Sequence, residues 1–251
     1  MQSVERFSSR VENYAKYRPG YPTAIVDLLR EECGLKEGSL IADIGSGTGK
    51  LCELFLANGN RVIGVEPNAA MRAAAESIFA GTRNFQSIEG TAESTTLDDA
   101  SVDFIIAGQA FHWFEPLKAK EECRRILKPN GWVVVIWNER QTDTTPFLRA
   151  YETLLLTYGT DYNEVRHENA EPAVKEFFAP RIPKFAQFPN HQEFDFQALR
   201  GRLCSSSYTP EPSSPSFQPM LAELESIFNT HQEAGIVRFE YDTRVFYEQL
   251  D

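Results

Sequence analysis

Cysteine, histidine and basic residues are scarce in this sequence, and each shortage argues against a class of protein. Only four cysteines occur among 251 residues, and they are widely scattered at positions 33, 52, 123 and 204. No C-x-x-C pair is present, so the chain lacks the pattern of a disulfide framework and that of a zinc site. We therefore expect reduced thiols, no bound metal and a cytoplasmic protein.

Long uncharged apolar runs are also missing, and residues 1–10 lack the apolar segment of a secretory signal. The chain has 25 Lys and Arg against 36 Asp and Glu, a formal net charge of −11. Such a surface repels a phosphate backbone. We expect a small-molecule partner, no nucleic acid and no membrane, and a monomer or homodimer.

Between residues 22 and 137 the sequence alternates between helical and strand-like patterns. Alternation of this kind is typical of an α/β fold with a doubly wound, mostly parallel sheet. We predict a Rossmann-like sheet of seven strands, with a turn at Pro129-Asn130-Gly131 before the fifth. The first five strands are expected at 40–44, 61–66, 85–89, 102–107 and 132–137, and helices at 22–29, 51–58, 69–79 and 117–127.

The rhythm changes after residue 140, which divides the chain into four predicted segments. Residues 1–38 form a lead-in with a helix, and residues 39–140 form the Rossmann-like core. Residues 141–181 are read as a helical insertion after strand 5 that forms a substrate lid. Residues 182–251 complete the sheet, with strands near 184–188 and 236–245 and a helix over 220–231.

A glycine-rich turn follows the first predicted strand, in the segment Asp43-Ile44-Gly45-Ser46-Gly47-Thr48-Gly49. Glycine permits positive φ and lets a ligand approach the backbone. A dinucleotide-binding loop, G-x-G-x-x-G, places its third glycine one residue later. A phosphate-binding loop, G-x-x-x-x-G-K-[ST], also fails, because Ile44 would stand at its first position and Leu51 follows Lys50.

The segment 43–49 instead matches D/E-x-G-x-G-x-G, and here the sequence resembles the class I S-adenosylmethionine-dependent methyltransferases. Glu66 ends the second strand, where an acidic side chain binds the cofactor ribose in that family. The segment 90–93 falls where family members contact the adenine, and Gln109 follows the fourth strand. The resemblance implies S-adenosylmethionine as cofactor, bound by Asp43, Gly45, Gly47, Gly49, Glu66, Ala92, Glu93 and Gln109.

Two further segments extend the resemblance. Residues 127–132 are similar to the family motif L-K-P-G-G-x, with Asn130 in place of the first glycine. The aromatic segment 109–114 precedes it and contains His112, the only histidine at the expected site. An imidazole titrates near neutral pH, so His112 is the candidate catalytic residue. As alternatives, it positions the substrate or simply packs beside Trp113.

The lead-in segment 14–22 is similar to a Y-x-x-x-R-P-x-Y-P pattern of small-molecule methyltransferases like trans-aconitate methyltransferase. The likeness implies that Tyr14 and Arg18 close over the cofactor. The guanidinium then pairs with the methionine carboxylate or with an acidic substrate. The alternative is an ordinary Arg-Pro boundary before a helix.

We predict a methyltransferase acting on a small molecule, one that carries a carboxylate if Arg18 and Arg202 neutralise an anion. The polar segment 200–208 lines a lid or ends a solvent-facing helix. Two other functions stay open: a non-catalytic module that binds S-adenosylmethionine, and a nicotinamide-dependent oxidoreductase. The second is disfavoured by the early third glycine and by the lack of a Tyr-x-x-x-Lys pair.

Overall fold

The computed structural model describes residues 11–162 and 170–250, except for the side chains of residues 12, 14 and 170. Among these residues, no helix is long and apolar enough to cross a membrane. The helices are α1 (Val11–Tyr17), α2 (Ala24–Cys33), α3 (Lys50–Ala57), α4 (Ala69–Ile78), the 3-10 turn η2 (Phe111–Trp113), α5 (Pro116–Ile126), α6 (Pro146–Tyr158), α8 (Ala170–Phe178), α9 (Phe196–Cys204) and α10 (Phe217–His231). The strands are β1 (Leu40–Ile44), β2 (Arg61–Val65), β3 (Phe85–Ile88), β4 (Val102–Gly108), β5 (Leu127–Arg140), β6 (Lys184–Phe194) and β7 (Val237–Gln249).

The seven strands form one sheet in the order β3-β2-β1-β4-β5-β7-β6. The strands from β3 to β5 are parallel neighbours, and β7 runs antiparallel to β5 and to β6. The inner parallel strands are buried on both faces, so they read as apolar runs rather than as alternating patterns. This arrangement confirms the predicted seven-stranded, mostly parallel sheet.

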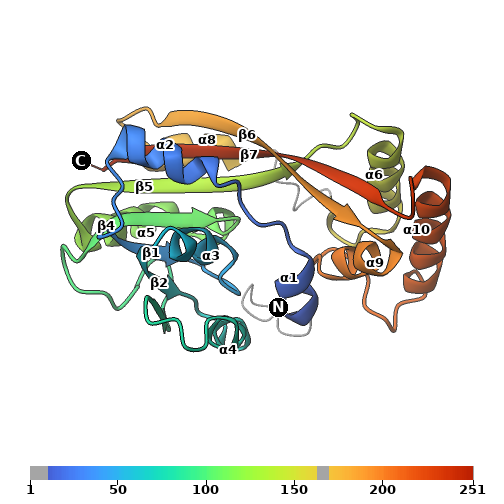
Figure 1. Ribbon diagram of the computed structural model, residues 1–251, viewed down its shortest axis with the longest axis horizontal. Coiled ribbons are helices and arrows are strands. Elements are labelled where there is room, and N and C mark those ends of the chain that lie inside the picture. Colours follow the sequence, from blue (N-terminus) through green and yellow to red (C-terminus); the bar gives the residue numbers. More distant parts are fainter. Residues whose placement is uncertain (1–10, 163–169, 251) are drawn as a thin grey trace.

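Helices cover both faces of the sheet (Figure 1). On one face, α2 and α3 pack against side chains such as Ile41, Phe104 and Val134. On the other face, α5 and α8 pack against Ile105, Val133 and their neighbours. Because successive residues of a strand point to opposite faces, Phe104 and Ile105 belong to different layers of the core.

The paired strands β6 and β7 continue beyond the sheet into a second lobe with α6, α9 and α10, at the right of Figure 1. The core of this lobe is aromatic, and Phe239 of β7 lies at its centre, fully buried. Its ring contacts Tyr151, Phe194 and Phe147 at centroid distances of 4.8, 5.2 and 5.4 Å. The two lobes therefore share a continuous pair of strands.

Two sequence expectations need correction. The predicted turn at Pro129-Asn130-Gly131 lies inside β5, which begins at Leu127. Asn130 has a φ of 66°, and the pairing with β4 shifts register there, so the turn signal marks an irregularity within a strand. Strands β6 and β7 are also longer than predicted. Within the predicted insertion 141–181, α6 joins the second lobe but α8 packs on the sheet.

We expect Phe239→Ala to lower the free energy of unfolding by about 3–5 kcal/mol, because the change leaves a cavity at the centre of an aromatic core. Phe185→Ala on β6 is the matched control, since that ring is 49% exposed, and its cost should be about 1 kcal/mol or less. Urea denaturation followed by circular dichroism measures both. Equal losses in the two variants would contradict this account of the second lobe.

Candidate functional site

A cavity of about 350 Å³ opens at the carboxyl ends of the parallel strands, between the sheet and the second lobe. Its walls come from the turn after β1, the ends of β2, β4 and β5, the loop after β3, the lead-in before α2, and the second lobe. Parallel strands end at one edge of a sheet, so this edge collects backbone groups and side chains from several loops. The volume is typical of a small-molecule site.

The turn after β1 depends on its glycines. Gly45 has a φ of 70°, and a Cβ there would lie 2.6 Å from the Cβ of Ala110. Gly49 has a φ of 85°, and a Cβ would lie 2.3 Å from the ring of Phe79. Gly45 and Gly47 line the cavity, whereas Gly49 lies behind it at the start of α3. The third glycine is therefore required by close packing against Phe79, and its role in binding a cofactor stays a prediction.

Glu66 follows β2 and is buried beside this turn. Its Oε2 accepts a hydrogen bond from the amide of Gly47, and its Oε1 accepts one from the amide of Asn68, both at 2.9 Å. Burial raises the pKa of Glu66, and the two amides and the charge of Arg72 oppose part of that rise. Each carboxylate oxygen keeps a lone pair for a ligand.

Asp43, also predicted to bind the cofactor, lies beneath the turn and does not line the cavity. Its Oδ2 accepts a hydrogen bond from the Cys52 thiol at 3.0 Å, and its Oδ1 has no partner among the described residues. Burial raises the pKa of Asp43 to about 7, although the thiol hydrogen bond lowers it and the charge of Glu66 adds to the rise. Asp43 therefore packs beneath the glycine turn, on the side away from the cavity.

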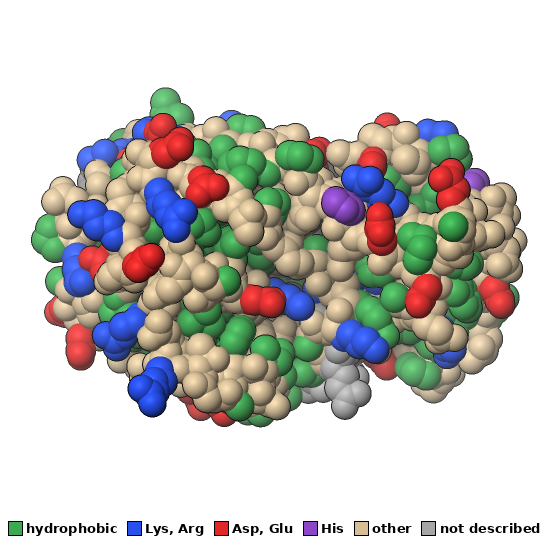
Figure 2. Space-filling model, viewed as in Figure 1, with side chains coloured by type: hydrophobic (Ala, Val, Ile, Leu, Met, Phe, Trp, Pro, Cys, Tyr) green, Lys and Arg blue, Asp and Glu red, His purple; other side chains and the backbone are tan. Residues whose placement is uncertain are grey.

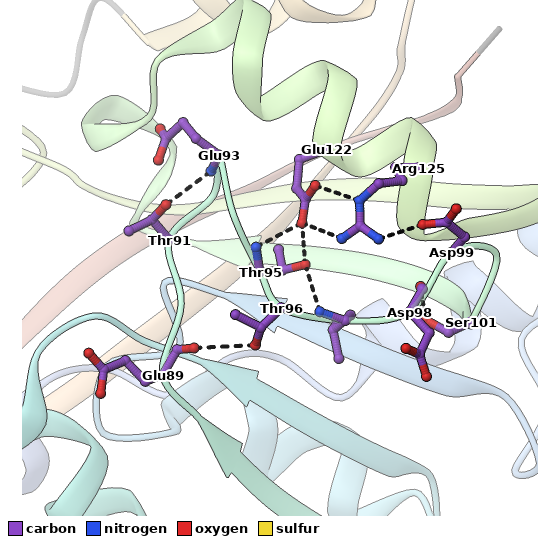
Figure 3. Close-up of polar contacts among 11 residues, drawn as sticks. Glu89, Thr91, Glu93, Thr95, Thr96, Asp98, Asp99, Ser101, Glu122 and Arg125 are labelled. Carbon is purple, nitrogen blue, oxygen red and sulfur yellow. Dashed lines mark hydrogen bonds and ion pairs between the residues drawn. The ribbon is translucent and has the colours of Figure 1, made fainter.

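The loop after β3 brings Ala92 and Glu93 to the cavity wall. The loop is anchored at Thr95, whose amide and hydroxyl both donate to Oε1 of Glu122, at 2.7 and 2.5 Å (Figure 3). Hydrogen bonds from Arg125 lower the pKa of Glu122 to about 2, and although burial opposes them, the Thr95 hydrogen bonds add to the shift. Glu93 itself accepts a hydrogen bond from the amide of Glu115 at 2.8 Å, which fixes its carboxylate at the rim.

Gln109 follows β4 in a left-handed conformation with a φ of 57°, which is unusual for a residue other than glycine. Its Nε2 donates to the carbonyl of Asn138 at 3.1 Å, and its Oε1 is buried with no partner among the described residues. His112 also lines the cavity, exposed and 4.5 Å from the Trp113 ring between centroids. The segment after β4 thus presents an acceptor oxygen and an imidazole together.

The lead-in reaches the cavity because polar side chains of the strands hold its backbone. Gln192 donates to the carbonyl of Tyr17, and Asn190 and Asn138 both donate to that of Gly20. Arg18 lines the cavity, and its Nη2 donates to the carbonyl of Ser205 at 3.0 Å. Tyr14, predicted to act with Arg18, lies on α1, but its side chain is outside the described part of the chain.

Sequence reasoning missed several residues of the cavity wall. The segment 138–140 ends β5, and its polar side chains after an apolar run are a readable signal of a strand end. Tyr241 carried no signal, because only the antiparallel register that pairs it with Arg140 brings it to the cavity. Tyr162 carried none either, and its hydroxyl lies there through hydrogen bonds with Arg140 and Glu152. The predicted polar segment 200–208 does reach it, through Arg202, Ser207 and Tyr208.

Comparison with known proteins agrees with this geometry. Residues 42–135 match a family model described as a methyltransferase domain. An uncharacterized methyltransferase-like protein of Schizosaccharomyces pombe is 33% identical, over 97% of this chain and 94% of that protein. An uncharacterized methyltransferase of Mycobacterium bovis is 35% identical over 53% of this chain and 52% of that protein. A solved structure from Anaeromyxobacter dehalogenans, assigned as a type II methyltransferase, has a TM-score of 0.67 at 20% identity and covers 93% of this chain and 98% of its own.

The raised pKa of Asp43 predicts a pH-dependent stability. The unfolded carboxyl group has a pKa of about 3.9, whereas the folded group has one of about 7. The native state therefore binds more protons between these values, and this group's contribution to stability is present at low pH and lost as the pH rises through 7.

We expect the free energy of unfolding of wild type to fall relative to that of Asp43→Asn between about pH 4 and pH 7, because the amide cannot ionise. The difference should then stay constant at higher pH. Urea denaturation at a series of pH values measures it. A difference that does not change with pH would contradict the raised pKa.

Proposed function

The chain belongs to the class I S-adenosylmethionine-dependent methyltransferases, and from this premise we propose that it methylates a small molecule that carries a carboxylate. The observation behind the proposal is a single cavity with two unlike ends. One end has the glycine turn and Glu66, and the other has arginines and tyrosines. Such a cavity suits a cofactor beside an acidic acceptor.

The first end fits S-adenosylmethionine, which supplies an electrophilic methyl group on a sulfonium when bound. Gly45 keeps the backbone of the turn open, since a Cβ would fill the space next to Ala110. Glu66 has lone pairs for two ribose hydroxyls, and Glu93 stands at the rim for the adenine amino group. The unpartnered Oε1 of Gln109 is suited to accept a hydrogen bond from the cofactor's ammonium group.

The second end favours a small acid as acceptor. Arg18, Arg140 and Arg202 all line the cavity, although the chain has a net charge of −11. Basic and acidic side chains are interspersed over the outer face that Figure 2 presents. Guanidinium groups gathered in one cavity of small-molecule size therefore suit an anionic metabolite better than a polymer.

In the proposed reaction a lone pair of the acceptor forms a bond to the methyl carbon while the carbon–sulfur bond breaks and its electrons stay on sulfur. A carboxylate acceptor has no proton to lose and becomes a neutral ester. A protonated acceptor passes its proton to His112 or to water. The protein's main contribution is to hold the reacting atoms close, aligned and away from bulk water.

The most direct test is a screen of small acids, phenols and amines for release of S-adenosylhomocysteine. We expect acids to be methylated, and S-adenosylmethionine and S-adenosylhomocysteine to raise the Tm where NAD and NADP do not. Stabilisation by NAD alone would refute the proposal and favour an oxidoreductase.

A cytoplasmic location and a monomeric or homodimeric state stay predictions. The four free cysteines and the acidic composition are consistent with them.

We expect Glu66→Gln to weaken the affinity for S-adenosylhomocysteine by about tenfold or more, because the amide loses a charge-assisted hydrogen bond to the ribose and disturbs the glycine turn. Glu89→Gln is the matched control: its side chain is 76% exposed, and we expect a change of less than about twofold. Isothermal titration calorimetry measures both affinities. An unchanged affinity in Glu66→Gln would remove Glu66 from the cofactor site.

A further inference from the structure

Arg202 is a buried cation without an acidic partner in the described part of the chain. It lies on α9, is 5% exposed and lines the cavity. Its Nη1 donates to Oγ of Ser206 at 3.1 Å, and its Nε is buried with no hydrogen-bond partner among the described residues. Arg140, by contrast, pairs with Glu152 and donates to the Tyr162 hydroxyl at 3.0 Å. A buried charge is costly unless an opposite charge accompanies it, so Arg202 calls for an anionic ligand.

The tyrosines and arginines around Arg202 also favour an anionic ligand at this position. Burial by itself would lower the pKa of Arg202, but the phenol groups of Tyr241, Tyr208 and Tyr151 hold it above its ordinary value, so the cation persists. Burial raises the pKa of Tyr208, yet the charges of Arg202, Arg18 and Arg140 together bring it below its ordinary value. This end of the cavity therefore has a positive potential that an anion would neutralise.

The order of the strands separates this positive end from the expected reacting centre. The cofactor residues follow β1, β2 and β3, and Gln109 follows β4, the next strand along the sheet. The amide of Gln109 donates to the carbonyl of Ile136, and its side chain donates to that of Asn138. Arg140 lies two residues further along β5, a distance of roughly 7 Å at 3.3 Å per residue. Arg202 lies beside Tyr241, the register partner of Arg140 on β7, which is one strand further from β4 in the sheet.

Resting on the proposed function, we infer that the acceptor is a bifunctional acid. Arg202 binds one carboxylate as a fixed handle, and the methyl group goes to a second nucleophile of the same molecule that lies beside Gln109. The planar guanidinium suits a carboxylate, with which it forms two parallel hydrogen bonds. A carboxylate held in this way is a weak nucleophile, because the arginine engages the lone pairs that would attack the methyl carbon.

The inference is tested with three probes of equal length on the wild-type enzyme saturated with S-adenosylhomocysteine. Pentanoate has one carboxylate, glutarate has two, and glutaramide has none. We expect calorimetry to detect pentanoate and glutarate but not glutaramide. Arg202→Gln should weaken pentanoate binding by about tenfold or more, since it removes a charge-assisted pair. Arg200→Gln is the matched control, because Arg200 lies on the same helix but is exposed, and it should change the affinity by less than about twofold.

The outcomes separate this inference from the proposed function. Failure of the wild-type protein to bind S-adenosylhomocysteine refutes the proposed function itself. If S-adenosylhomocysteine binds but neither acid does, or if Arg202→Gln retains full affinity for pentanoate, the result refutes only the claim that Arg202 binds a carboxylate of the acceptor. Inorganic phosphate that binds more tightly than pentanoate, and depends on Arg202, overturns the assignment to a carboxylate.

A kinetic experiment tests whether Arg202 binds the acceptor without taking part in methyl transfer. It uses S-adenosylmethionine in place of S-adenosylhomocysteine. Pentanoate should bind competitively against an acid substrate without being methylated, because it lacks the second nucleophile. For an acid that the screen identifies as a substrate, Arg202→Gln should raise KM by about tenfold with kcat within about threefold. Methylation of pentanoate that depends on Arg202, or a loss of kcat at unchanged KM, would place Arg202 at the reacting atoms and overturn the inference.

Discussion

A buried carboxylate bridge between two turns is the interaction on which the cavity depends. The Glu66 carboxylate accepts hydrogen bonds from the amides of Gly47 and Asn68, so it joins the turn after β1 to the start of α4. Asn68 in turn caps α4 by accepting from the amides of Ala70 and Met71. Two orphan helix donors and a buried anion are thereby satisfied in one network, which costs far less than leaving either unpaired. The backbone of the glycine turn that lines the cavity is therefore held in place by the protein's own side chains.

The second lobe is placed with comparable precision because strands, rather than a flexible linker, carry it. β7 pairs with β5 from Trp132 to Arg140 and continues, paired with β6, into the aromatic core around Phe239. The lead-in then closes one side, where the Tyr17 ring packs on Gly201 of α9 so closely that a Cβ there would lie 2.1 Å from it. The arginine end of the cavity is consequently fixed relative to the glycine turn.

Local sequence signals predicted the parallel half of the sheet, and they singled out the glycine turn and Glu66, which the structure brings together at one cavity. Buried parallel strands read as apolar runs, and a glycine turn with an acidic residue after the next strand is a short-range pattern. Local patterns could not predict three other features: the length of β6 and β7, the irregularity at Asn130, and the position of Tyr241 beside Arg140. They depend on strand pairing between segments far apart in the sequence, such as Arg140 with Tyr241, and on burial that tertiary packing alone decides. The segment 200–208 shows this limit well, because a helix end and a cavity wall have the same composition.

The contrast between an acidic chain and a cationic cavity follows from the range of electrostatic forces. In physiological salt, surface charges are screened within about 8 Å, so the net charge acts mainly on large polyanions that touch much of the surface. Inside the cavity the lower dielectric strengthens a single close pair with Arg202. Glu152 pairs with Arg140 and balances its charge. Under the proposed function, a buried guanidinium inside the cavity and an acidic exterior would together select a small acid over a polymeric one, by charge and by size.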